Sequence, residues 1–101
     1  MNRSEYQLQI LESAKKFIDS LPSKDQADIL ADLGAVKQSD FEIIKVKILK
    51  GKIKELIVRK YRILFFIRSG SVYVTNGFVK KSQKTPKREI DYAEKINKLI
   101  N

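Results

Sequence analysis

The segment from Tyr61 to Arg68, with the sequence YRILFFIR, constrains the fold more than any other part of the chain. Side chains of a β-strand alternate between its two faces. Here one face carries Tyr61, Ile63, Phe65 and Ile67, and the other carries Leu64 and Phe66. Apolar residues on both faces are typical of a strand in the middle of a sheet. We therefore expect 61–68 to be a central strand.

The remaining pattern predicts further strands and three helices. Alternation predicts a strand over 6–10, and apolar runs predict strands over 53–59 and 72–79, the latter following a tight hairpin at Ser69-Gly70. Helical spacing predicts a helical hairpin over about 13–37 and a final helix after Pro86, with Thr85 as its cap. The order β-α-α-β-β-β-α describes one α+β domain over residues 1–101, with a small antiparallel sheet of mixed edge and helices on one side.

Asn76 and Gly77 interrupt the last predicted strand. Such a pair is common in turns, but too few residues follow it for another strand to form. We therefore expect a β-bulge here, or a place where the backbone is approached closely.

Cysteine and histidine are both absent from the sequence. Their absence excludes disulfides, thiolate nucleophiles, Ser-His-Asp triads and metal sites built on either residue. Any catalysis must use Lys, Arg, Tyr, Asp, Glu, Ser or Thr, and we expect neither a metal ion nor another cofactor.

No segment suggests a membrane. The longest apolar run, Ile63 to Ile67, is far shorter than the roughly 20 residues that span a bilayer. The first residues carry no apolar signal-peptide segment. We expect a soluble protein located in the cytoplasm.

The charge of the chain is strongly uneven. Its net charge is +9, from 21 basic and 12 acidic residues. Residues 1–40 are slightly acidic, whereas 14 basic residues and one acid, Glu55, lie between Lys45 and Arg88. Such a field predicts a polyanion or an acidic protein as the partner, with a merely soluble basic surface as the alternative.

A lysine-rich stretch is the first of three basic features. It contains Lys45, Lys47, Lys50, Lys52 and Lys54. Alternation places Lys50, Lys52 and Lys54 on one strand face or at its edge, where they suit phosphate binding. The alternative is an edge strand that lysines protect from aggregation.

Arg62, inside the central strand, is the second basic feature. It shares a face with Leu64 and Phe66, where a charge is costly unless it is paired or beside a solvent-filled hollow. A guanidinium there suits bidentate phosphate binding. The alternative is a structural ion pair with Glu55 on the neighbouring strand.

A basic loop that runs into the final helix is the third basic feature. Its cations are Lys80, Lys81, Lys84, Lys87 and Arg88. A helix N-terminus already attracts anions, so cations placed there oppose the helix dipole unless an anion binds among them. The alternative is a solvated charge run.

These features together resemble the RelE/ParE superfamily of toxin–antitoxin toxins, and most closely its HigB-like, phage-related branch. The run Gly77 to Ile90 carries most of the resemblance, followed by Tyr61 to Phe66. Shorter matches are Leu49-Lys50-Gly51 and Glu55-Leu56, and residues 20–30 match a helical hairpin more loosely. The resemblance covers nearly the whole chain.

The resemblance implies a RelE-like fold and a toxin that cleaves mRNA on the ribosome. It also implies a cognate antitoxin, often with a helix-turn-helix DNA-binding region. The tyrosine–arginine strand motif of the family corresponds to Tyr61 and Arg62, and its second cation to Lys81. RelE has lysines where this chain has Ile53 and Glu55, and some HigB relatives use histidines, which this chain lacks.

We therefore expect a metal-independent endoribonuclease in which Arg62 stabilises the charge on phosphorus. Lys81 or Lys84 would assist or act as the base, and Tyr61 or Tyr92 would supply an acid or a stacking surface. The other cations would bind phosphates: Lys45, Lys47, Lys50, Lys52, Lys54, Lys80, Lys87 and Arg88. The alternatives are a ParE-like toxin that blocks DNA gyrase, and an inactive antitoxin-binding or nucleic-acid-binding module. Tyr61 could instead be a core residue.

Overall fold

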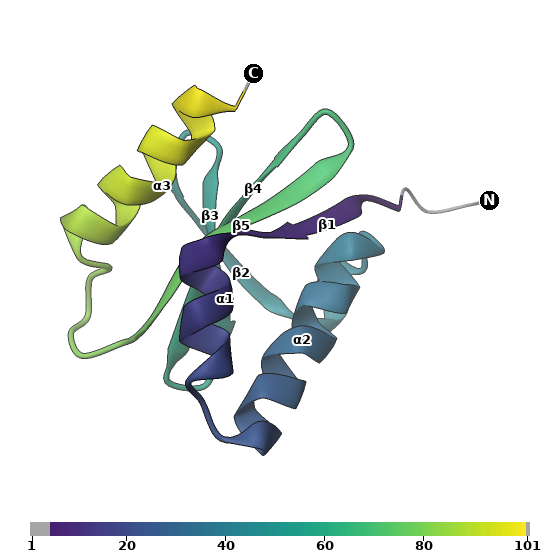
Figure 1. Cartoon of the computed structure of the whole chain (residues 1–101), viewed down its shortest axis with the longest axis vertical. Coiled ribbons are helices and arrows are strands. Elements are labelled where there is room, and N and C mark those ends of the chain that lie inside the picture. Colours follow the sequence, from purple (N-terminus) through teal and green to yellow (C-terminus); the bar gives the residue numbers. More distant parts are fainter. Residues whose placement is uncertain (1–4, 101) are drawn as a thin grey trace.

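A run of three hairpins forms most of the sheet in the computed structural model, which describes residues 5–100 (Figure 1). The strands β2 (Lys45–Lys50), β3 (Ile53–Val58), β4 (Tyr61–Arg68) and β5 (Ser71–Val79) pair antiparallel in that order. At the far edge β1 (Gln7–Ile10) pairs parallel with β5. The α+β class, the mixed edge and the central place of β4 are confirmed.

All three hairpin loops have two residues, because Lys50 pairs with Ile53, Val58 with Tyr61 and Arg68 with Ser71. The first loop residue has a positive φ each time: 54° at Gly51, 53° at Arg59 and 50° at Ser69. Such angles match the twist of the flanking strands.

The first hairpin corrects one expectation. The stretch 45–54 contains β2 and the start of β3, whereas the predicted order has no separate strand before 53–59, so the sheet has one strand more than predicted. Lys50, Lys52 and Lys54 do not share a strand face, because Lys50 lies in β2, Lys52 in the turn and Lys54 in β3.

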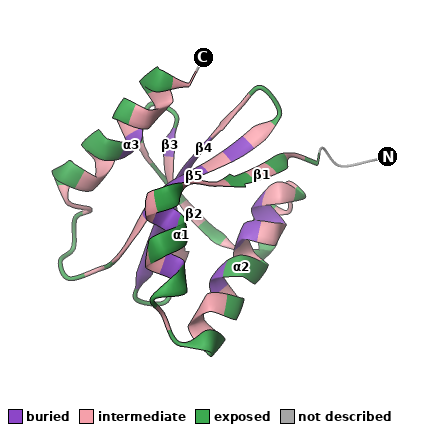
Figure 2. Ribbon diagram, viewed as in Figure 1, coloured by how far each residue is buried: buried purple, intermediate pink, exposed green. Residues whose placement is uncertain are grey.

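Helices cover both faces of the sheet, so the expected packing on one side was wrong. On one face, α1 (Glu12–Asp19) and α2 (Ser23–Lys37) bury a cluster that includes Ile63 and Phe65 of β4. On the other, α3 (Lys87–Leu99) covers Leu64 and Phe66. A strand that is apolar on both faces needs a cover on each. Figure 2 shows the helices exposed on their outer sides and buried towards the sheet.

β5 contains the expected bulge. Leu64 pairs with Asn76 but Phe65 pairs with Val74, so Thr75 is an extra residue in the strand. After it the alternation of faces reverses: Val74 packs beneath α1 and α2, whereas Phe78 packs on the α3 side. Gly77 therefore faces α1, where a Cβ would lie 2.5 Å from Cδ2 of Phe17. The close backbone approach is confirmed as well.

α3 is fastened to the sheet at both ends. Near its start the Asn76 amide donates to Oε1 of Glu89 at 2.9 Å. At its end Nη1 of Arg68 donates to the carbonyl oxygen of Asn97 at 2.6 Å, and also to that of Ile100. Thr85 is not its cap: Pro86 occupies that position, and the Thr85 hydroxyl bonds to Glu55 instead.

The helices of residues 5–100 are too short or too polar to cross a membrane. The short 3-10 helix Phe41–Ile43 joins α2 to β2.

Candidate functional site

Strand register places Arg62 in a row of four residues across the α3 face. Lys45 pairs with Ile57, Ile57 with Arg62, and Arg62 with Phe78. The next row, which starts with Lys47 and Glu55, leads towards the cluster beneath α3. The segment 80–86 crosses this end of the face, because Thr85 donates a 2.5 Å hydrogen bond to Oε2 of Glu55.

The guanidinium of Arg62 is buried, with only 9% of the residue exposed. Its Nη1 donates to the backbone oxygens of Arg59 at 2.6 Å and Tyr61 at 2.9 Å. Its Nε lies 4.0 Å from Oε1 of Glu55 and has no hydrogen-bond partner in the described part of the chain. The ion pair with Glu55, which was the alternative interpretation of Arg62, is therefore present but long, and it leaves one buried donor unsatisfied.

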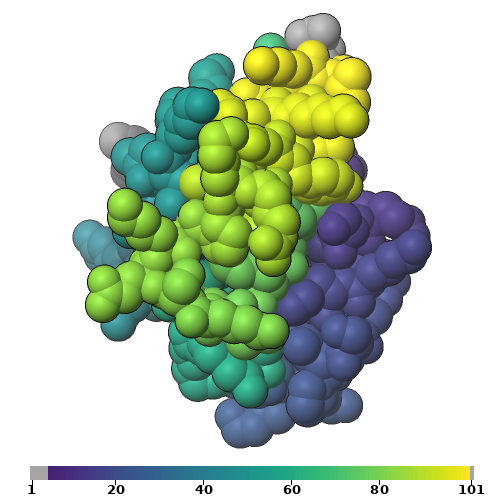
Figure 3. Space-filling view, turned by 90° about the vertical axis from the view of Figure 1, so that its left-hand side faces the viewer, coloured from purple at the N-terminus to yellow at the C-terminus, as the bar shows by residue number. Residues whose placement is uncertain are grey.

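A hollow of about 260 Å³ lies beside this row, between the end of β5 and the first turn of α3. It is lined by Phe78, Val79, Lys81, Ser82, Pro86, Arg88 and Glu89. Lys81 and Arg88 are exposed, and so is Lys84 farther along the segment. The amide of Lys80 donates to the Lys60 oxygen at 2.8 Å, which holds the start of the segment against the β3–β4 loop. Figure 3 shows the segment and α3 from this side.

The lysines of the β2–β3 hairpin are divided between the two faces. Val46 packs towards α1 and α2, so its neighbours Lys45 and Lys47 lie on the same face as Arg62. Lys54 lies on the opposite face, because its neighbours Ile53 and Glu55 in β3 both point towards the α3 side. Lys50 pairs with Glu94 of α3 at 3.4 Å. At the start of α3, Lys87 pairs with Asp91 at 2.8 Å.

The two tyrosines proposed for the site, Tyr61 and Tyr92, lie on opposite sides of the sheet. Tyr61 is buried on the α1–α2 face, where its ring meets Phe17 edge-on and its hydroxyl donates to Asp25 at 2.5 Å. This hydrogen bond raises the pKa of Tyr61, and the placement makes it a core residue outside the group around Arg62. Tyr92 is exposed on α3, one turn after Arg88 and hence on the same flank of the helix.

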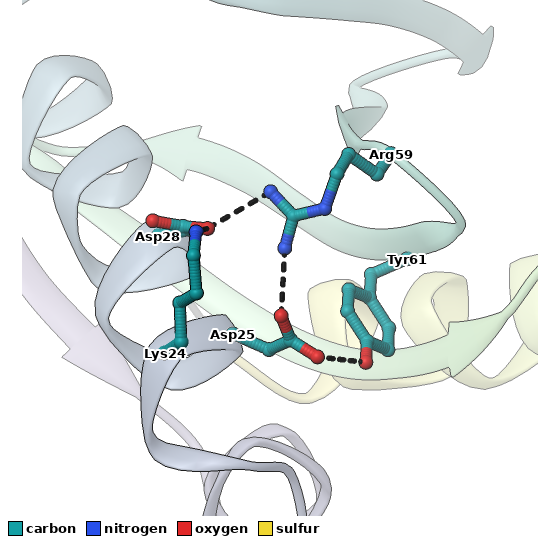
Figure 4. A network of polar contacts seen from close by, with 5 residues as sticks. All are labelled: Lys24, Asp25, Asp28, Arg59 and Tyr61. Carbon is teal, nitrogen blue, oxygen red and sulfur yellow. Dashed lines mark hydrogen bonds and ion pairs between the residues drawn. The ribbon is translucent and has the colours of Figure 1, made fainter.

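A second polar group ties the β3–β4 loop to α2 (Figure 4). Arg59 donates to Asp25 at 2.8 Å and to Asp28 at 2.9 Å. The hydrogen bond from Tyr61, and then the charge of Arg59, lower the pKa of Asp25 against the effect of burial. Lys24 lies 3.4 Å from Asp28 at the rim of this group.

A family model of phage-derived Gp49-like proteins (DUF891) matches residues 16–98. The chain belongs to this Gp49-like family. Among solved structures, its fold is similar to a chain in the crystal structure of the archaeal RelE–RelB complex from Pyrococcus horikoshii OT3. The TM-score is 0.66 at 16% identity, over 73% of this chain and 93% of that one. No curated protein matches the sequence.

The Gp49-like match includes the strands around Arg62 and nearly all of α3, and it leaves out β1, the start of α1 and the last residue of α3. Within residues 5–100 of this Gp49-like protein, no three carboxylates gather closely enough to hold a metal ion. The candidate chemistry is cationic: Arg62 supplies a buried guanidinium, and the exposed Lys81 and Arg88 line a hollow that reaches Phe78, the strand partner of Arg62.

Sequence reasoning missed the Arg59 group of this Gp49-like chain. Arg59 is 31 residues from Asp28 and 34 residues from Asp25 in the sequence, and no motif links them. Two signals were visible: aspartates three apart on a predicted helix, and an arginine at the end of a predicted strand. Neither shows that the helix and the loop meet in space.

Proposed function

We propose that this Gp49-like protein is the toxin of a type II toxin–antitoxin system, of the HigB-like branch, acting as one domain in the cytoplasm. Its activity would be ribosome-dependent cleavage of mRNA without a metal ion. The membership of the family and the RelE-like fold support a toxin. The cations around Arg62 support RNA as its substrate.

The buried Nε of Arg62 is the observation that carries this proposal. A buried donor left unpaired costs about 1–3 kcal/mol, so native proteins seldom keep one without a reason. The Glu55 carboxylate is 4.0 Å away from it, beyond hydrogen-bond distance. A phosphate oxygen that entered beside this nitrogen would supply the missing acceptor in a charge-assisted hydrogen bond.

The proposed reaction is attack of a ribose 2′-hydroxyl on the adjacent phosphorus. The new P–O2′ bond forms while the P–O5′ bond breaks, and this leaves a 2′,3′-cyclic phosphate and a 5′-hydroxyl. A base accepts the 2′-hydroxyl proton, and the leaving O5′ receives a proton from an acid or water. Negative charge builds up on the phosphate oxygens, and Arg62 would stabilise it because a guanidinium keeps its proton.

The exposed cations would divide the remaining roles. Lys81, at the rim of the hollow, or Lys84 would assist Arg62 or accept the proton. Tyr92 would stack on a base or donate a proton. Lys45, Lys47, Lys80 and Arg88 would hold the RNA backbone around this end of the sheet, with Lys50, Lys52 and Lys87 farther out. Lys54 and Tyr61, on the opposite face, are left out of the proposed site.

The proposed partners are mRNA on the ribosome and a cognate antitoxin that carries a helix-turn-helix region. The structure with the similar fold is described as a RelE–RelB complex. An antitoxin that meets the basic segment 45–88 should be acidic there, because opposite charges favour rapid and specific association.

Expression of the wild type, Arg62→Lys and Lys81→Ala tests the proposal. Lysine at position 62 keeps a charge beside Glu55, so the fold should survive while the guanidinium is lost. We expect the wild type to arrest growth and to produce new mRNA ends with a 5′-hydroxyl inside translated regions. Either variant should reduce cleavage of ribosome-bound mRNA about 10²- to 10³-fold, as loss of one charge-stabilising donor does.

Lys16→Ala is the matched control, because it removes an exposed cation from α1 on the opposite face. It should cleave like the wild type. Growth arrest without new mRNA ends would overturn the nuclease and favour a ParE-like block of gyrase. No arrest by folded wild type would favour an inactive binding module.

A further inference from the structure

Arg59 occupies a backbone position that favours glycine. It is the first residue of the two-residue loop between β3 and β4, and its φ is 53°. Left-handed backbone at this position is strained for a residue with a Cβ. The two-residue turn alone therefore gives no reason for an arginine, so a reason should lie in its side chain.

The side chain of Arg59 holds two aspartates on successive turns of α2. Its Nη2 donates to Oδ1 of Asp25 at 2.8 Å, and its Nη1 donates to Oδ2 of Asp28 at 2.9 Å (Figure 4). The side chain is 52% exposed, and ion pairs at such sites contribute little to stability. The two hydrogen bonds from Arg59 instead fix the orientation of its side chain, because a planar guanidinium sets the direction of both contacts.

The backbone of the same residue contacts the other face of the sheet. The Arg59 carbonyl accepts the 2.6 Å hydrogen bond from Nη1 of Arg62, the shorter of the two that this nitrogen donates. Arg62 belongs to the α3 face, whereas Asp25 and Asp28 belong to α2. Arg59 thus joins a helix on one face to the guanidinium on the other, with its side chain bound to α2 and its carbonyl oxygen bound to Arg62.

We propose that Arg59 is a positioning residue for Arg62. Asp25 and Asp28 hold its side chain, this grip fixes the left-handed turn, and the turn aims the Arg59 carbonyl at Nη1 of Arg62. The guanidinium is thereby held with its Nε facing Glu55, where it can donate a hydrogen bond to a bound anion. The consequence for catalysis rests on the proposed function, whereas the effect on the orientation of Arg62 does not.

The first experiment observes Arg62 directly, in the protein alone. Nuclear magnetic resonance of arginine Nε–H groups should give a distinct, slowly exchanging signal for Arg62, assigned by its loss in Arg62→Lys. Arg59→Gly suits the left-handed turn and removes only the contacts with Asp25 and Asp28, so the fold should persist. The Arg62 signal should then broaden, or its Nε proton should exchange faster with water. An unchanged Arg62 signal in folded Arg59→Gly would overturn the positioning role.

Two further variants sharpen this readout. Lys60→Gly makes the same change at the next position of the loop and removes one exposed cation, so it should keep the Arg62 signal. Asp25→Asn combined with Asp28→Asn removes the grip from the helix side and should reproduce Arg59→Gly. A loss of the signal in Lys60→Gly as well would point to loop flexibility alone and would count against Arg59.

The second experiment is a double-mutant cycle on cleavage of ribosome-bound mRNA. Arg59→Gly should slow cleavage about tenfold or more, as small misplacements of catalytic groups do. In the Arg62→Lys background it should have no further effect, because residues that act through one another are not additive. Equal slowing in both backgrounds would overturn positioning and leave the nuclease intact. A wild type without cleavage would overturn the nuclease, and the resonance experiment would still decide the positioning role.

Discussion

Arg62 and Glu55 are two charges that the fold keeps away from water on the α3 face, at 9% and 2% exposure. Removing one partner of a buried pair commonly costs about 3–5 kcal/mol, whereas apolar residues in place of both are often neutral or stabilising. An apolar pair would thus serve the fold as well or better. Retention of both charges is what a functional role for Arg62 predicts.

Asp25 gives the protein a pH dependence with a definite sign. The hydrogen bond from Tyr61 and the charge of Arg59 hold the pKa of Asp25 below its usual value. A carboxyl group with a lowered folded-state pKa stabilises the fold fully above its unfolded pKa of about 3.9, and this contribution is lost as the pH falls through the lower folded value.

We therefore expect Asp25→Asn to be less stable than the wild type at neutral pH. The difference should shrink as the pH falls below about 4, because the wild-type carboxylate then takes up a proton too. Urea unfolding of both proteins between pH 7 and pH 2 measures this difference. A gap that stays constant over this range would show that the ionised carboxylate contributes nothing through Tyr61 and Arg59.

The sequence alone predicted a residue's role best where residues of the same strand or of the adjacent strand determine that role. Arg62 stood out because a charge inside an apolar strand is costly, and Glu55 followed as its partner because adjacent strands bring the two together. Tyr61 was ambiguous, since its own strand is apolar on both faces. Asp25, which accepts the hydrogen bond from the buried Tyr61 hydroxyl, is 36 residues away in the sequence.

At the scale of elements, the close contact between β5 and α1 depends on Gly77, because glycine has no side chain. A Cβ there would lie 2.5 Å from Cδ2 of Phe17 and 2.9 Å from Cδ1 of Ile63. Both neighbours belong to or pack against the buried cluster beneath α1 and α2, so neither can move freely. The helix can lie this close to the strand only because residue 77 is glycine.

We expect Gly77→Ala to destabilise the protein by about 1–3 kcal/mol, the range for overpacking a core. Chemical unfolding measures this loss, and Phe17→Leu should recover part of it in the double variant. Gly34→Ala is the matched control: no atom lies within 4 Å of its Cβ, and in a helix the change should stabilise by about 0.5–1 kcal/mol. Equal stability of Gly77→Ala and the wild type would contradict the close contact.

The elements show what a linear pattern can and cannot predict. Strands and helices followed from periodicity, and the bulge in β5 followed from Asn76-Gly77. The β2–β3 hairpin was missed because Lys50, Lys52 and Lys54 continue the alternation through a turn at Gly51. The position of α3 was missed because an apolar stripe does not say which face of a sheet it covers. Leu64 and Phe66 needed a cover on the second face, and that was the available clue.

At the scale of the whole molecule, the proposed binding of RNA to the basic segment should weaken as the salt concentration rises. Single-stranded RNA affinity falls with salt at a logarithmic slope of about −0.7 per phosphate contacted, so six contacts give roughly −4. Lys45 and Lys47 share the face of Arg62, whereas Lys15 and Lys16 lie on α1 over the opposite face.

Replacing both Lys45 and Lys47 by alanine should therefore flatten the slope by about 1.4. Replacing Lys15 and Lys16 removes the same charge and should leave the slope unchanged. Fluorescence anisotropy with a labelled RNA oligonucleotide over a series of salt concentrations measures both. Equal effects of the two pairs would mean that net charge attracts the RNA and that no particular face does.

The bulge at Thr75 decides which face of the sheet the last residues of β5 present. If Thr75 entered the ladder opposite Leu64, the alternation would run unbroken and residues 76–79 would exchange faces. Phe78 would then turn towards α1 and leave its place next to Arg62, although no residue of the strand had changed. Loss of the Thr75 codon alone would instead keep Asn76 opposite Leu64 and Phe78 opposite Arg62, so a lineage could remove the bulge and still retain the surroundings of Arg62.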